Sequence, residues 1–498
     1  MKNKYGILIV LSFLCPLVVP VVADEGRPNV IMFVMDDLGD WIGPMGHKQA
    51  ITPNMDRLAK SGVTFLNAHA PGVFCAPSRT AIWSGLQAST TGCYANEVFR
   101  YDYPDVVTMQ TAFKQGGYNN YGAGKLYHHR GGYVDLKDWD EYYSRGPAMR
   151  DEGWEMNGYH QSDPPRPEPY PYSPYFQKYG SGAGHLEWGP IANDKEEEMF
   201  DVMRANYIRD VIKREHDKPF FAAVGLYIPH YPNYAPQKYF DMYDLDDIEL
   251  PAYKEDDLDD LAPNVRNRYK NRAKQHQQLI DMDCLKDAVR GQLACITFAD
   301  AMLGRILDTL EESPHKDNTI IVFWSDQGFH HGEKGHWGKE TLWQRTTRVP
   351  FIWAGPGISK DQKVKTTVSL IDLYPTFADL CGLPKKEDLE GVSLASVLKD
   401  PSTAAERSIF IPHTIRGGGG YAVVNSDWRY IQYGDGAEEL YDLKKDPNEW
   451  DNIADEPERK SIIEKLRKTA PEKFAAPATP RSELNLIVEG DSFRWEKK

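Results

Sequence analysis

The 498-residue sequence has fewer basic than acidic residues and few cysteines. After its N-terminal segment it has no long apolar run. Lys and Arg together number 58, against 73 Asp and Glu, and the net charge is -15 at pH 7. Nucleic-acid binding needs clustered Lys and Arg, so this balance argues against a nucleic-acid partner. We also expect no membrane span, because no segment after Ala23 approaches the ~20 apolar residues that a spanning helix needs.

The one long apolar run, at the N-terminus, predicts a signal peptide. Residues 1–23 begin with two lysines, continue through an apolar stretch that Pro16 and Pro20 interrupt, and end at Ala23. This order is typical of a secretory signal that is cleaved after Ala23. We therefore expect an exported protein, either periplasmic or secreted.

The few cysteines leave an odd number after signal removal. Cys15 lies in the predicted signal, and the others are Cys75, Cys93, Cys284, Cys295 and Cys381. An odd number in an exported chain leaves at least one thiol unpaired. Cys284 and Cys295 are candidates for a disulfide, whereas Cys93 and Cys381 are candidates for buried thiols. Cys75 differs from all of them because it stands among small residues just before an arginine.

Apolar strands alternate with helical segments along most of the chain. Strands are predicted within residues 29–35, 63–70, 118–129, 218–232 and 318–328, and helices within residues 51–62, 76–85 and 291–313. This alternation predicts an α/β sheet whose polar ligands gather at the carboxyl ends of its strands.

The pattern changes near Pro401. Short antiparallel strands are predicted within residues 407–413, 420–434 and 437–447, followed by a helix over 456–468. We therefore expect two domains after the signal peptide: a large one over residues 24–400 and a smaller one over residues 401–498.

Polar pairs close two of the predicted buried strands. Asp36 and Asp37 end the first strand, and Asp326 and Gln327 end the last strand of the large domain. Carboxylate and amide oxygens are the ligands of Ca²⁺ or Mg²⁺ rather than of Zn²⁺. A single Asp-Asp pair is more often a helix cap or a turn, but two pairs at matching strand ends favour a metal site.

Cys75 precedes Arg79 by four residues in a predicted helix. This spacing places the guanidinium one turn along the same face, where it would lower the pKa of a thiol or stabilise a bound anion. The alternative is a buried structural cysteine, which is the common role of an isolated Cys.

The stretch CAPSRTAIWSG, residues 75–85, resembles the sulfatase signature C-x-P-S-R-x-x-x-x-x-G. The resemblance covers nearly the whole chain after the signal, through NVIMFVMDDLG, GKLYHH, KPFFAAVGLYIPH, SDQGFHHGEKGHWGK and EELYDLKKDPNEWDNIAD. It implies an alkaline-phosphatase-like fold, in which a large mixed sheet with flanking helices precedes a smaller C-terminal antiparallel sheet. The GKLYHH and KPFF segments are most similar to the iduronate-2-sulfatase branch, which acts on carbohydrates.

The resemblance also assigns site residues. It implies that a maturation enzyme oxidises Cys75 to formylglycine (3-oxoalanine), whose hydrate is the nucleophile. One Ca²⁺ would be bound by Asp36, Asp37, Asp326, Gln327 and the modified Cys75, although many relatives have Asn or His in place of Gln327. The sulfate would be surrounded by Arg79, Lys125 and Lys339.

Two histidines are expected to carry protons, since histidine titrates near neutral pH. By resemblance, His230 protonates the departing sugar oxygen and His128 accepts a proton as sulfate leaves, while Asp326 helps to deprotonate the attacking hydroxyl. His129 is an alternative to His128. Ordinary core or surface roles are expected for His47, His69, His330, His331, His336 and His413.

The expected substrate is a sulfated carbohydrate, either algal, such as ulvan or carrageenan, or a glycosaminoglycan. Aromatic and basic residues of the 145–190 segment, Trp337, Arg416 and the Gly417–Gly420 run are candidates for sugar subsites, with ordinary loop packing equally open. One alternative function is that of a phosphodiesterase or phosphonate monoester hydrolase of the same superfamily. Another is an inactive protein that binds sulfated glycans.

Overall fold

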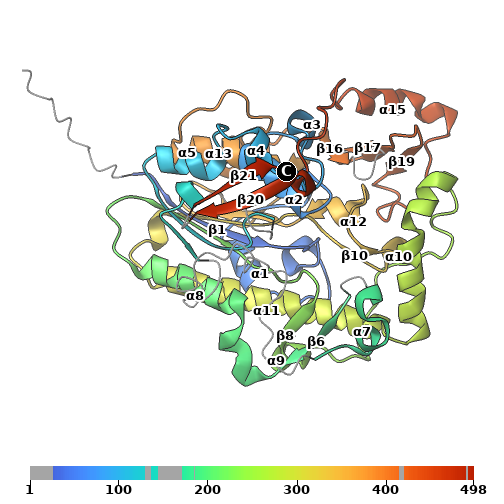
Figure 1. Ribbon diagram of the computed structural model, residues 1–498, viewed down its shortest axis with the longest axis horizontal. Helices are drawn as coiled ribbons and strands as arrows, with labels where there is room; N and C mark the ends of the chain where they lie inside the picture. Colours follow the sequence, from blue (N-terminus) through green and yellow to red (C-terminus); the bar gives the residue numbers. More distant parts are fainter. Residues whose placement is uncertain (1–25, 129–135, 144–170, 184–185, 414–419, 490–491) are drawn as a thin grey trace, which may run out of the picture.

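The computed structural model describes residues 26–128, 136–143, 171–183, 186–413, 420–489 and 492–498 (Figure 1). Its largest element is an eight-stranded mixed sheet in the order β14-β2-β13-β9-β1-β7-β4-β5. The strands are β1 Asn29–Met35, β2 Gly62–Phe65, β4 Asn119–Gly124, β5 Glu141–Tyr143, β7 Phe220–Gly225, β9 Thr319–Ser325, β13 Phe351–Ala354 and β14 Gln362–Val364. The five strands from β9 to β5 run parallel, and β13 pairs antiparallel with β9 and β2.

Helices cover both faces of this sheet (Figure 1). The main ones are α1 Pro53–Lys60, α2 Cys75–Ser84, α5 Met109–Gln115, α8 Phe200–Lys213, α11 Leu285–Glu311 and α13 Leu373–Cys381. Another helix, α10 Pro263–Asp281, lies beside the C-terminal part of the chain instead (Figure 1). Successive side chains of β1 point to opposite faces of the sheet. Ile31 and Phe33 pack against the layer of α8 and α11, and Met32 packs against the layer of α2, α5 and α13. A strand that is buried on both faces reads as a continuous apolar run, which explains the sequence of β1.

Smaller elements connect these layers. They include β3 Ala68–His69, α3 Ala88–Thr91, α4 Phe99–Asp102, α7 Pro174–Tyr179, β10 His330–His331, β11 Trp337–Gly338, α12 Gln344–Thr347, β12 Arg348–Val349 and β15 Val368–Ser369. Others are β6 Trp188–Ile191, β8 Asn233–Pro236, α9 Gln237–Phe240 and α14 Ala395–Lys399. The predicted strand over 63–70 is thus two short strands, because the chain leaves the large sheet after Phe65 and joins a separate three-stranded sheet at Ala68.

The predicted C-terminal strands form a separate four-stranded antiparallel sheet. It consists of β16 Ile409–His413, β17 Gly420–Val424, β18 Trp428–Gln432 and β19 Glu438–Asp442, and α15 Lys460–Arg467 packs on it. The predicted α/β class with a smaller antiparallel sheet is therefore confirmed.

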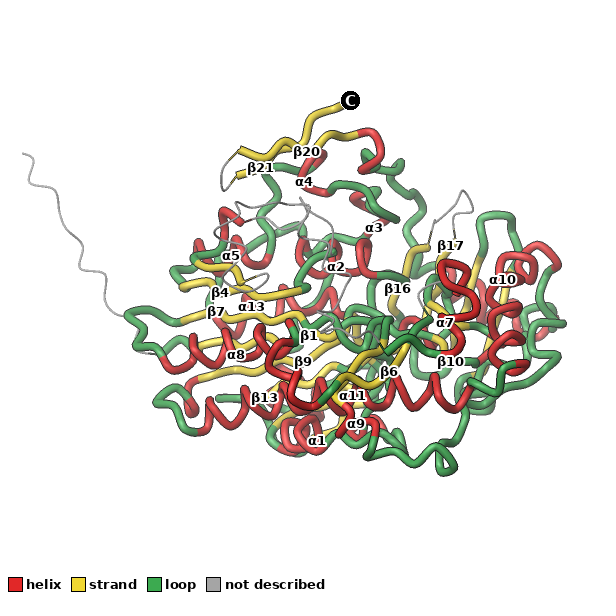
Figure 2. Tube along the Cα trace, turned by 60° about the horizontal axis from the view of Figure 1, so that its bottom comes forward, coloured by secondary structure: helices red, strands yellow, loops and turns green. Residues whose placement is uncertain are grey.

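The last residues of the chain leave this sheet and return to the large unit. Val98 N donates to Thr479 O (3.1 Å) and Ala475 N donates to Ser89 O (2.7 Å). A hairpin of β20 Leu484–Glu489 and β21 Ser492–Lys497 follows and lies over α4 (Figure 2). A domain boundary at residue 401 stays a prediction. Phe474 still packs on Phe410 and Tyr421 of the C-terminal sheet, and the contacts with the large unit begin at Ala475.

The five described cysteines are all free thiols, so the suggested Cys284–Cys295 disulfide is wrong. Cys284 immediately precedes α11 and Cys295 lies within it. Eleven residues of helix rise about 16 Å, far more than the Cα separation that a disulfide spans. Cys93 and Cys381 are buried, as expected.

Two sequence predictions concern the N-terminal signal peptide and membrane-spanning helices. The predicted signal peptide, residues 1–23, lies outside the described residues. Within the described part of the chain, no helix combines the length and apolar character that crossing a bilayer requires.

One long-range cap ties the first helix to the longest one. Asp300 of α11 accepts hydrogen bonds from Asn54 N (3.1 Å), Met55 N (2.7 Å) and Asn54 Nδ2 (2.8 Å) at the start of α1. Thr52, which precedes α1, makes no side-chain capping bond. Asp300 therefore satisfies the free backbone N–H groups of α1 from a distant element.

We expect Asp300→Ala to lower the free energy of unfolding by about 1–3 kcal/mol, because it leaves buried donors of α1 without an acceptor. The measurement is the urea midpoint at constant m-value. Asp308→Ala is the matched control: Asp308 also lies on α11 and pairs with α1 through Arg57 (2.7 Å), but it is exposed. Its loss should cost under about 0.5 kcal/mol, and equal effects of the two substitutions would contradict the capping role.

Candidate active site

Four neighbouring parallel strands deliver the predicted residues to one edge of the sheet. Asp36 and Asp37 follow β1, Asp326 and Gln327 follow β9, and Lys125 follows β4. Met35 lies opposite Ser325 in the β1–β9 register, so the two acidic ends are adjacent. The sheet thus brings together residues far apart in sequence, as predicted for the carboxyl ends of its strands.

Cys75 lies at the centre of this group. It is the first residue of α2, and its Sγ lies 3.4 Å from Asp36 Oδ1 and 3.2 Å from Lys339 Nζ. Lys125 Nζ lies 3.8 Å from Sγ, and Gln327 Nε2 lies 3.5 Å from it. Burial raises the pKa of the Cys75 thiol to about 12. Arg79 lowers this pKa, as expected, but desolvation outweighs the effect of Arg79 and Lys339.

Arg79 reaches the group from one turn along α2. Its Nε donates to Asp326 Oδ2 (2.7 Å), and its guanidinium also donates to the backbone oxygen of Lys125. Asp326 Oδ1 accepts from Gln327 N (3.0 Å) and Asp37 N (3.3 Å). Asp326 therefore connects Arg79 to the backbone that follows β1 and β9.

Lysines compensate the other two carboxylates. Lys125 Nζ forms an ion pair with Asp36, and Lys339 Nζ pairs with Asp37 Oδ1 (2.7 Å). Burial raises the pKa of Asp37 to about 6, although Lys339 opposes this shift. Burial and the positive charge of Lys339 hold the pKa of Lys125 well below its usual value. Burial would also lower the pKa of Lys339, but Asp37 and Cys75 outweigh it and raise that pKa.

The oxygen atoms of this group fit a hard divalent cation. Ligand oxygens of Asp36, Asp37 and Asp326 lie within 4.8 Å of one another. Gln327 Oε1 is buried and has no hydrogen-bond partner among the described residues. A buried oxygen of this kind beside three carboxylates is a suitable ligand for Ca²⁺ or Mg²⁺.

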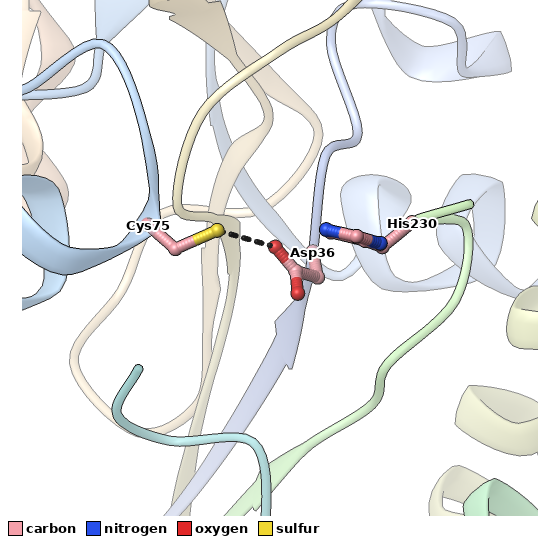
Figure 3. Close-up of side chains that lie close together, drawn as sticks. All are labelled: Asp36, Cys75 and His230. Carbon is pink, nitrogen blue, oxygen red and sulfur yellow. Dashed lines mark hydrogen bonds between the residues drawn. The ribbon is translucent and has the colours of Figure 1, made fainter. Parts of the chain in front are cut away.

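His230 approaches the carboxylates from the loop after β7. Cys75 and His230 lie on opposite sides of Asp36 (Figure 3). His230 Nε2 lies 3.6 Å from Asp37 Oδ2, and Nδ1 lies 2.5 Å from Tyr231 O. Because a backbone carbonyl only accepts, Nδ1 carries a proton and Nε2 faces the site.

A buried ion pair on α8, missed in the sequence, holds the loop of His230. Asp201 accepts hydrogen bonds from Tyr227 N (3.0 Å) and Ile228 N (3.0 Å) and pairs with Arg204 (2.5 Å). The only sequence signal is the Asp-Arg spacing of three, which usually marks an exposed helical pair.

His128 lies to one side of the centre, next to Arg79. It is buried, its ring stands edge-on to Phe74 at 6.4 Å, and it lines a small cavity together with Arg79. The alternative residue, His129, lies outside the described residues.

The described residues test only some of the suggested sugar subsites. Trp337 is fully buried and donates from Nε1 to His276 Nδ1 (2.9 Å), so it offers no face to a sugar and this candidate is wrong. Tyr175 of α7 is also buried and stacks on Trp188. Arg416, residues 417–419 and residues 145–170 lie outside the described residues, and Gly420 begins β17. The histidines assigned to ordinary roles include His69, His330, His331 and His336, which are buried.

Comparisons with known families and proteins give one consistent result. Residues 28–383 match the family described as Sulfatase, and residues 332–475 match the family described as N-sulphoglucosamine sulphohydrolase, C-terminal. A protein named Sulfatase from Formosa agariphila is 36% identical, covering 95% of this chain and 93% of the relative. An ulvan-active sulfatase of the same organism is 26% identical (90% and 81% covered), and the iduronate 2-sulfatase of Mus musculus is 27% identical (72% and 69% covered).

Solved structures share the fold. A 2-O GAG sulfatase superposes with a TM-score of 0.68 at 21% identity, covering 89% of this chain and 90% of the other. The phosphonate monoester hydrolase of Agrobacterium radiobacter superposes with a TM-score of 0.71 at 19% identity, covering 95% and 100%. These likenesses confirm the expected alkaline-phosphatase-like architecture.

We expect Ca²⁺ or Mg²⁺ to raise the thermal midpoint of metal-free protein, because a cation that binds only the folded state stabilises it. The shift should be larger at about pH 7.5 than at about pH 5, since below its raised pKa Asp37 holds a proton that competes with the cation.

Asp326→Asn should reduce this shift, whereas Asp308→Asn, a change at an exposed acid, should leave it unchanged. The measurement is differential scanning fluorimetry after chelation. Absence of any shift at both pH values would contradict a metal site.

Proposed function

The chain belongs to the sulfatase family and hydrolyses sulfate esters, and we propose that its substrate is a sulfated carbohydrate. The observation that supports the active role best is the position of Cys75, whose Sγ lies among Asp36, Lys125 and Lys339. An inactive glycan-binding protein has no need to bury a cysteine and so many charges at one point, because burying charges is costly.

We propose a polysaccharide-derived substrate and an iduronate-2-sulfatase-like branch. The ulvan-active relative and the mouse iduronate 2-sulfatase both align with most of this chain. An algal polysaccharide such as ulvan or carrageenan, or a glycosaminoglycan, is consistent with these relatives. The N-terminal segment supports export, and we propose that the enzyme acts in the periplasm or outside the cell.

Cys75 is the proposed precursor of the nucleophile. Its Sγ lies within reach of Asp36, Lys125 and Lys339, so an aldehyde hydrate at this position would lie among the proposed ligands and cations, which supports oxidation to formylglycine by a maturation enzyme. In the mature site, the formylglycine hydrate supplies an attacking hydroxyl and a bound Ca²⁺ supplies positive charge. Asp36, Asp37, Asp326 and Gln327 are the proposed ligands of that ion, together with the modified Cys75.

Three cations are proposed to hold the sulfate. Lys125 and Lys339 both reach Cys75, and Arg79 is anchored by Asp326 with its guanidinium toward Asp36 (3.8 Å). Fixed positive charges in a site closed to water stabilise the charge that develops on sulfate oxygens in the transition state. Since Asp326 anchors Arg79, we propose that it positions this cation and binds metal rather than acting as a base.

The histidines are proposed to move protons on two sides of the centre. The Nε2 atom of His230 faces the carboxylates from the β7 side, where it can protonate the departing sugar oxygen. His128 lies on the Arg79 side, where it can accept a proton as sulfate is released. Separate positions allow one histidine to act as acid and the other as base.

A substrate panel tests the proposed function. Sulfate release from sulfated oligosaccharides should exceed hydrolysis of a phosphonate monoester or a phosphodiester, and mass spectrometry of the peptide with Cys75 should show formylglycine. Cys75→Ala should lower kcat by about 10³-fold or more, as expected for loss of a nucleophile. Cys93→Ala, another buried free cysteine, is the control.

Faster turnover of the phosphorus esters would identify the alternative hydrolase of the same fold. An unmodified Cys75 thiol throughout an active preparation would overturn the formylglycine assignment.

We expect His230→Gln to lower kcat on a sulfated sugar by about 10²–10⁴-fold, because an alkoxide leaves poorly without a proton donor. An aryl sulfate with a nitrophenolate leaving group should lose far less, since that group departs without protonation. The measurement is steady-state kinetics on both substrates. Equal losses on both would contradict an acid role for His230.

A further inference from the structure

A small, partly open cavity lies against Arg79 and His128. Its volume is about 40 Å³. It is lined by Arg79, Thr80, Trp83, Ser84, Val98, Phe99, Arg100, Thr108, Gln110, Tyr127 and His128. The cavity therefore has a polar wall next to two proposed site residues and an apolar wall formed by Trp83, Val98 and Phe99.

Gln110 is the most unusual residue of this wall. It lies in the first turn of α5 and is fully buried. Its backbone oxygen accepts from Asn120 Nδ2 (2.8 Å), which fixes the main chain. Its side-chain atoms Nε2 and Oε1 both lack a hydrogen-bond partner among the described residues. Buried amides are nearly always paired, so these two atoms require a partner.

Water is the partner that fits the space. A buried water needs about 10–15 Å³ of such volume and two to four polar contacts, so the cavity has room for about three waters. The amide of Gln110 offers both a donor and an acceptor, and the hydroxyls of Thr80, Ser84 and Thr108 line the same space. No Asp or Glu is among the lining residues in the described part of the chain.

The cavity shares a wall with the proposed chemistry. The guanidinium of Arg79 spans from Asp326 to the backbone of Lys125, and the same residue lines the cavity. His128 lines it too and is fixed on another side by the edge of Phe74. None of the proposed metal ligands lines this space, so ordered water in it would support Arg79 and His128 without touching those ligands.

We propose that the cavity holds ordered water and that Gln110 positions this water against Arg79 and His128. Gln110 is then a positioning residue of the site, acting through water rather than by touching the substrate. The mechanistic part of this inference rests on the proposed sulfatase function, whereas the presence of water does not.

A high-resolution crystal structure of the wild-type protein is the first test. We expect two or three density peaks within hydrogen-bond distance of Gln110 Nε2 or Oε1, consistent with the room for about three waters. A dry cavity in the wild-type crystal would overturn the proposal.

Gln110→Met is the second test, because it keeps the length of the side chain and removes both polar atoms. It should lower kcat on an aryl sulfate about tenfold with KM within about twofold, as for residues that orient a site from outside. It should also lower the thermal midpoint by leaving the waters with too few partners. A dry cavity predicts the opposite, because removing an unpaired buried amide stabilises a protein.

Gln292→Met is the matched control. Gln292 is also buried, its Oε1 also lacks a partner among the described residues, and it lies on α11 across the sheet. The kcat of the Gln292→Met variant should equal that of the wild type. Unchanged kcat together with a raised midpoint in Gln110→Met would overturn the proposal. A wild-type protein that cleaves no sulfate ester would instead refute the proposed function, and the density and midpoints would still decide whether Gln110 holds water.

Discussion

The compensation of three buried carboxylates by two buried cations and one half-buried cation is the constraint on which this site depends. Asp36, Asp37 and Asp326 end adjacent strands, where burial disfavours their charge. Lys125, Lys339 and Arg79 neutralise them one by one. Removing one partner of a buried pair leaves an uncompensated charge, which is far more costly than losing a surface pair. In the proposed function the same three cations hold the sulfate, so stability and anion binding would depend on the same residues.

The scaffold holds this arrangement through parts that never touch it. The parallel order β9-β1-β7-β4 fixes the spacing of the strand ends, and Asp201 on α8 holds the loop that carries His230. Cys75 enters from the opposite layer as the first residue of α2. A site built from several elements in this way is rigid because each element is fixed by its own core contacts rather than by the site.

The sequence predicted the elements well wherever local periodicity was strong. The apolar runs of β1 and β9 and the helix after Cys75 appear where they were expected. It failed where the outcome depended on packing: Cys284 and Cys295 are three helical turns apart, and Trp337 is buried against His276. Cysteine spacing and aromatic content carry no information about which helix or core a residue joins.

By itself the sequence determined the strand ends, the acidic pairs and the cysteine signature, because alternation, helical spacing and short motifs are local properties of the chain. Only the tertiary structure decided that Asp37 meets Asp326 across 289 residues, that Arg79 pairs with Asp326, and that Gln110 faces a cavity. These contacts follow from strand order and from the packing of helices on both faces of the sheet. Strand order and helix packing cannot be read from any short stretch of sequence. The free energy that selects them comes from burying surfaces contributed by distant segments.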